Sequence, residues 1–165
     1  MSNTRTIRDG IVVGLIGYAS VAVFYSAFDF LAARGTLYTV NMLGRAVFRG
    51  LRDPAVLEFP VVLDPTAIML YNALHLALAL SIGLIVTGLV AIGERSPASR
   101  RGVRFLIAGG FVVTIAAIGF LTTSLRPVLP WWSIVVANAL AVRLAGLYFV
   151  RARPGIWRRL ALLAH

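Results

Sequence analysis

Five polar side chains stand inside long apolar stretches of this sequence, and their types could carry protons or hold a small ligand. They are Tyr25, Asp29, Asn72, His75 and Asn138. Tyr25 precedes Asp29 by four residues and Asn72 precedes His75 by three, so each pair shares one face of a helix. If these faces converge, they form a small outward-opening polar pocket with an anion, a proton-carrying histidine and hydrogen-bond donors.

The stretches that hold these residues have the length of membrane spans. A bilayer core about 30 Å thick requires roughly 20 apolar residues in a helix. Four windows meet this requirement: residues 11–33, 67–93, 105–125 and 128–150, interrupted only by Asp29 in the first and Arg143 in the last. They are apolar nearly all round, unlike the helices of a soluble bundle. The sequence therefore predicts an all-helical polytopic membrane protein, a single domain whose four spans form an antiparallel bundle.

Composition and charge agree with a membrane protein and indicate its orientation. Hydrophobic residues make up 59% of the 165-residue chain, and all 16 basic residues are arginine, as in bacterial chains from GC-rich genomes. The arginines flank apolar runs, which does not fit nucleic-acid binding. Ten arginines lie in the two terminal segments and the second connection, and five lie in the first and third connections. Cytoplasmic segments of membrane proteins carry the excess of arginine. We expect a bacterial inner-membrane protein with cytoplasmic termini.

The connection after the first span contains a segment with helical periodicity. Between residues 36 and 52, apolar residues recur every three or four positions at Leu37, Val40, Leu43, Val47 and Leu51, opposite Asn41, Arg45, Arg49 and Arg52. This pattern predicts an amphipathic helix that either lies in the membrane interface with its arginines toward headgroups or covers the bundle as a lid. Trp131 and Trp132 are also expected at the interface.

The polar residues have a structural interpretation as well as a functional one. Asp29 lies near the end of its span, where Arg34 or Arg126 could neutralise it. His75 and Asn72 could make hydrogen bonds between helices, which are common in membrane bundles. We favour this structural interpretation over the pocket.

A stripe of small residues follows His75 along the second span. Its members recur at four-residue spacing: Ala79, Gly83, Thr87 and Ala91. Gly10 and Gly14 have the same spacing near the start of the first span. Because small residues let helix backbones approach closely, these positions predict helix-packing faces.

The function classes differ in how well the residues support them. The sequence has no cysteine and no nucleophile or phosphate-binding motif, so we expect no enzyme. His75 could ligate haem b only by pairing with a histidine of another chain. Asp29 could couple protons to substrate in a homodimeric transporter, although such an acid belongs near the midplane. We favour a structural, accessory or assembly subunit without a cofactor, in contact with lipids and with other subunits or a second copy.

Overall fold

The structure is a computed structural model that describes residues 3–50 and 62–152. This part of the chain forms five α-helices and two short 3₁₀ turns: α1 (Asn3–Leu31), α2 (Tyr38–Phe48), α3 (Pro65–Arg95), η2 (Pro97–Ser99), α4 (Arg100–Leu121), η3 (Thr123–Leu125) and α5 (Trp131–Ala152). Helices α1, α3, α4 and α5 are long and apolar enough to cross a membrane. The predicted all-helical fold with four spans is therefore confirmed, and the chain is a multi-pass membrane protein.

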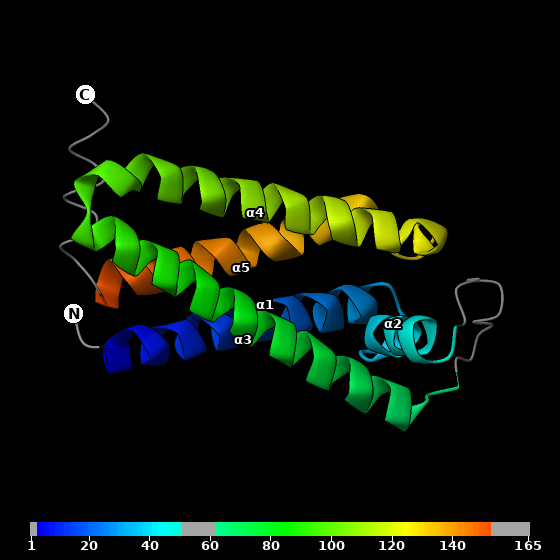
Figure 1. Cartoon of the computed structure of the whole chain (residues 1–165). Helices are drawn as coiled ribbons and strands as arrows, with labels where there is room; N and C mark the ends of the chain where they lie inside the picture. Colours follow the sequence, from blue (N-terminus) through cyan, green and yellow to red (C-terminus); the bar gives the residue numbers. More distant parts are fainter. Residues whose placement is uncertain (1–2, 51–61, 153–165) are drawn as a thin grey trace.

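The four long helices run lengthwise beside one another, and α2 lies across one end of them (Figure 1). We call this end the α2 end; it also holds the connection between α4 and α5. The opposite end, the terminal end, holds the start of α1, the η2 turn and the end of α5. Arg5 donates a hydrogen bond to the carbonyl of Ala152 at 2.8 Å, which joins the first and last described helices there.

The helices and the predicted spans differ at their boundaries. Helix α1 begins at Asn3, ahead of the window at residue 11, because a charge-free window marks apolar surface and not the hydrogen-bonded helix. Helix α4 ends at Leu121, short of the predicted residue 125. There the hydroxyl of Thr122 donates to the carbonyl of Ile118 at 2.7 Å, and the hydroxyl of Thr123 donates to that of Phe120 at 2.8 Å. These bonds occupy carbonyls at the helix end, and the chain continues into η3.

The start of α3 follows the local sequence signal. The carboxylate of Asp64 accepts a hydrogen bond from the amide of Ala67 at 2.9 Å, and Pro65 occupies the first turn. Aspartate suits the capping position because it satisfies a free amide, and proline suits the first turn because it has no amide to leave unpaired. Helix α3 therefore begins at Pro65, two residues ahead of the predicted span at residues 67–93.

Helices α1 and α3 cross at a contact made of glycines. A side chain at Gly83 would meet the carbonyl of Gly10 and would come within 2.8 Å of Cα of Gly14. Gly83, Thr87 and Ala91 are buried. The small-residue stripe of α3 thus lies largely within the chain's own bundle, where it lets the two backbones pack directly.

Helix α2 packs on the α2 end through a hydrophobic cluster. The buried members of this cluster are Tyr38, Met42 and Ala46 of α2, Leu125 and Leu129 of the α4–α5 connection, and Ile134 of α5. Met42 is fully buried. Helix α2 therefore holds the start of α5 and the α4–α5 connection in place.

The face of α2 that contacts the bundle differs from the one that the apolar spacing suggested. Leu37 and Val47 of the predicted apolar stripe are exposed, whereas Asn41 of the predicted polar side is fully buried. The reason is that Asn41 bonds to the segment before α3. In a membrane protein, an apolar stripe can face lipid as readily as it faces a core.

Candidate functional site

Asp29 lies in the last turn of α1 and is 1% exposed. Its carboxylate accepts hydrogen bonds from the backbone amide of Thr39 at 2.6 Å and from the hydroxyl of Thr39 at 2.7 Å. Thr39 is the second residue of α2, whose capping residue Leu37 makes no side-chain bond. Asp29 therefore satisfies a free amide in the first turn of α2 and places a negative charge at the positive end of that helix.

Arg34 connects Asp29 to two further segments. One guanidinium nitrogen lies 3.3 Å from the carboxylate of Asp29, and another donates to the carbonyl of Val128 at 3.0 Å. The guanidinium also lies over the rings of Phe28 and Tyr38, at 5.1 and 4.6 Å from their centroids. Of the two arginines expected as partners of Asp29, Arg34 is the one that the structure pairs with it. We call Asp29, Arg34 and Thr39 the Asp29 cluster.

His75 and Asn72 belong to a second polar group, between α1 and α3. The hydroxyl of Tyr18 donates to the side-chain oxygen of Asn72 at 2.9 Å, so this bond joins the two helices. The half-buried imidazole of His75 has the ring of Tyr18 at 5.2 Å and the ring of Tyr71 at 6.2 Å. The bond to Asn72 is an interhelical hydrogen bond of the kind that we favoured, whereas the printed contacts of His75 are with aromatic rings.

The other two candidates, Tyr25 and Asn138, have partners of different kinds. The hydroxyl of Tyr25 lies 3.3 Å from that of Ser133 on α5. Because the hydroxyl of Ser133 donates to the carbonyl of Pro130, Tyr25 is the donor in this pair. The amide of Asn138 donates to the carbonyl of Ile134 in its own helix, at 2.8 Å. The five candidates are thus distributed over separate hydrogen-bonded groups.

Asp9 is a buried acid that the sequence reasoning missed. It is fully buried near the terminal end of α1 and accepts a hydrogen bond from the hydroxyl of Tyr148 on α5 at 3.0 Å. The predicted span begins at residue 11, so Asp9 lies outside it. The available signal was Tyr148, an aromatic hydroxyl near the same end of the fourth window.

A third group of contacts ties α2 to the start of α3. Asn41 donates to the carbonyl of Val62 at 3.2 Å and accepts from the amide of Asp64 at 2.9 Å. Arg49 donates to the carboxylate of Asp64 at 3.0 Å. Arg45, also expected at the interface, is half-buried in the last turn of α2, and Arg52 lies outside the described residues.

The ion pair between Arg49 and Asp64 predicts a pH dependence. The Arg49 guanidinium and the amide of Ala67 hold the pKa of the Asp64 carboxyl below its ordinary value of 3.8. A lowered pKa adds stability that is present above the ordinary value and is lost as the pH falls through the lowered one. We therefore expect the thermal midpoint of the detergent-solubilised protein to fall less steeply below about pH 4 in Asp64→Asn than in the parent chain. Equal slopes in the two proteins would contradict this role of Asp64.

Trp131 and Trp132 open α5 at the α2 end and are both exposed. The ring of Trp132 packs against Phe28 with centroids 5.7 Å apart. Exposed tryptophans at the end of an apolar helix are typical of the zone where hydrocarbon meets headgroups.

The three groups of contacts mainly join neighbouring helices to one another. Both oxygens of Asp29 accept hydrogen bonds, and the partners of Asn72, Tyr25 and Asn41 belong to neighbouring elements. Within residues 3–50 and 62–152 there is no group of three or more histidine, aspartate or glutamate side chains placed to hold a metal ion. Comparisons with protein-family models, with curated proteins and with solved structures found no match for this chain.

Proposed function

We propose that this chain is a structural or accessory subunit of a larger assembly in the bacterial inner membrane, with cytoplasmic termini and without chemistry of its own. The excess of arginine at the terminal end supports this orientation. The observation that carries the subunit role is the uncovered outward face of α4. In its most apolar stretch only 6% of the residues are buried, against 17% in each of the other three spans.

The uncovered face has a regular pattern that we call the α4 stripe. Its members alternate between small and large residues at spacings of four and three: Gly102, Leu106, Gly109, Val113, Ala116 and Phe120. All six are exposed. A seven-residue repeat of this kind presents knobs and holes to a second helix, and small residues at every seventh position allow close approach.

Three glycines of α1 and α3 are packed inside the bundle, whereas two glycines of α4 have open space beside them. Gly10, Gly14 and Gly83 are in direct contact at the α1–α3 crossing. By contrast, side chains added at Gly102 and Gly109 would have no neighbour within 4 Å. The same residue type that joins α1 to α3 is therefore available on α4 for a helix from another chain.

The contacts of Asp29 and His75 give less support to the alternative functions. A coupling acid in a transporter must exchange protons near the membrane midplane, whereas Asp29 lies in the last turn of α1 with its oxygens bonded to Thr39 and Arg34. His75 has ring contacts with Tyr18 and Tyr71, and a second haem ligand would have to come from another chain. The α4 stripe favours the subunit role over both.

Photocrosslinking in native membranes tests the subunit role. We expect a photoreactive residue at Val113, which is 67% exposed on the α4 stripe, to form one defined adduct with a different protein. The matched control is Ile85 on α3, which is 62% exposed, and it should give no such adduct. Gly109→Leu, which adds bulk to the stripe where the chain has open space, should abolish the Val113 adduct. An adduct of twice the chain mass, or adducts with lipid alone, would contradict the role.

A further inference from the structure

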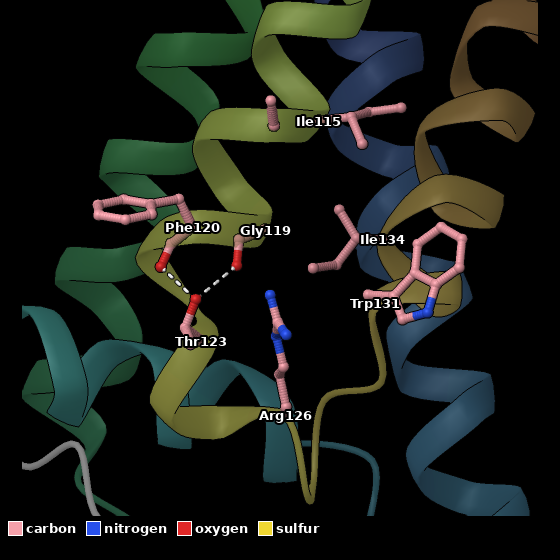
Figure 2. Close-up of a pocket in the computed structure, with 8 residues that line it drawn as sticks. Ile115, Gly119, Phe120, Thr123, Arg126, Trp131 and Ile134 are labelled. Carbon is pink, nitrogen blue, oxygen red and sulfur yellow. Dashed lines mark hydrogen bonds between the residues drawn. The ribbon is translucent and has the colours of Figure 1, made fainter.

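An open groove lies between α4 and α5 at the α2 end (Figure 2). Its volume is about 350 Å³, within the range of small-ligand sites. Its walls are apolar and are formed by Ile115, Gly119 and Phe120 of α4 and Ile134 of α5. The hydroxyl of Thr123, which also lines the groove, donates to the carbonyls of Gly119 and Phe120 in α4. The walls therefore suit hydrocarbon.

One cation lies in this apolar groove. Figure 2 shows the side chain of Arg126 extending from the α4–α5 connection into the space between the two helices. No carboxylate of the described residues pairs with it, whereas Arg34 and Arg49 each have an aspartate. A guanidinium beside an apolar surface, close to the end of two membrane helices, is complementary to a ligand with an anionic head and a hydrocarbon tail.

We propose that this groove binds one anionic phospholipid, with its phosphate on Arg126 and an acyl chain along α4. From Thr123 to Ile115 the groove follows α4 for about 12 Å, parallel to the direction in which lipid chains run. Trp131 stands at the groove in the first turn of α5, where aromatic rings meet headgroups. The positive end of α5 adds to the attraction for a phosphate.

This assignment does not rest on the proposed subunit role, because the charge that selects the lipid is outside the α4 stripe. Arg126 is in the connection between the spans, and Ile134 and Trp131 belong to α5. Ala116 and Phe120 belong to both the groove and the α4 stripe, so the two proposals share part of α4 but not the charge that selects the lipid.

Quenching of tryptophan fluorescence by brominated lipids tests the site in the full-length chain. Trp132→Phe and Trp157→Phe leave Trp131 as the reporter beside the groove. In phosphatidylcholine vesicles, we expect chain-brominated phosphatidylglycerol to bind about fivefold more strongly at Trp131 than brominated phosphatidylcholine. Arg126→Gln should remove this preference, whereas Arg104→Gln, at the exposed far end of α4, should retain it.

A second variant separates lipid binding from folding. Gly119→Leu fills the groove at a position with no neighbour within 4 Å, so the bundle stays folded while quenching by either brominated lipid falls. Gly109→Leu, on the outward face of α4, leaves quenching unchanged. Equal quenching by the two lipids, or a preference that survives Arg126→Gln, overturns the proposal. Loss of the preference on adding inorganic phosphate assigns Arg126 to a soluble anion and also overturns it.

Discussion

A Gly83→Ala variant is expected to have a free energy of unfolding about 3 kcal/mol below that of the parent chain, although alanine is the better helix former. The added methyl group would meet the carbonyl of Gly10 and Cα of Gly14. Both are backbone atoms of α1, so no flexible side chain can move aside. Helices α1 and α3 would have to separate, which would also weaken the hydrogen bond between Tyr18 and Asn72.

Unfolding in mixed micelles, followed by circular dichroism at increasing fractions of denaturing detergent, measures this change. Gly88→Ala in the same helix and Gly17→Ala in α1 are the matched controls, because a side chain at either position has no neighbour within 4 Å. Both controls should be as stable as the parent chain or up to about 1 kcal/mol more stable, because alanine favours the helix and meets no neighbour there. If Gly83→Ala unfolds at the same point as Gly88→Ala, the close crossing of α1 and α3 is not a source of stability.

The contact between Gly83 and the glycines of α1 shows which part of the helix packing could be predicted from the sequence. The four-residue spacing of small residues predicted packing faces on two spans, because close approach of helices requires small residues. The spacing could not show that Gly83 meets Gly10 and Gly14, since which faces pair depends on the arrangement of all the helices. For the same reason, the stripe on α4 and the groove beside it are visible only once α4 and α5 are placed.

The Asp29 cluster could be predicted only in part from the sequence, for a different reason. The residue type and its position near the end of a span predicted a neutralising arginine, and Arg34 fulfils this expectation. The bonds to Thr39 were not predicted, because they depend on a turn between α1 and α2. In that turn Ala33 and Gly35 have positive φ values of 55° and 81°. This conformation brings the first turn of α2 back onto α1 and turns a candidate functional acid into a helix cap.

An Asp29→Ala variant is expected to release α2 from the bundle. The change removes the acceptor for the amide and the hydroxyl of Thr39 and leaves Arg34, whose side chain is 15% exposed, without its carboxylate. Removing one partner of a buried pair costs about 3 to 5 kcal/mol. Because the chain has no cysteine, a single cysteine in place of the fully buried Met42 reports the release. This cysteine should react slowly with a maleimide in the parent background and at least tenfold faster with Asp29→Ala.

A control cysteine and the conservative variant Asp29→Asn distinguish a capping role of Asp29 from proton coupling. A cysteine at Leu37, the exposed capping residue of α2, should react at one rate in both backgrounds. Asp29→Asn keeps one oxygen acceptor for Thr39 but loses the charge toward Arg34, so its cysteine at position 42 should react at an intermediate rate. A proton-carrying acid would give another pattern, because removing its carboxyl would abolish transport while α2 stayed closed. A protected cysteine in Asp29→Ala would therefore refute the capping role and favour proton coupling.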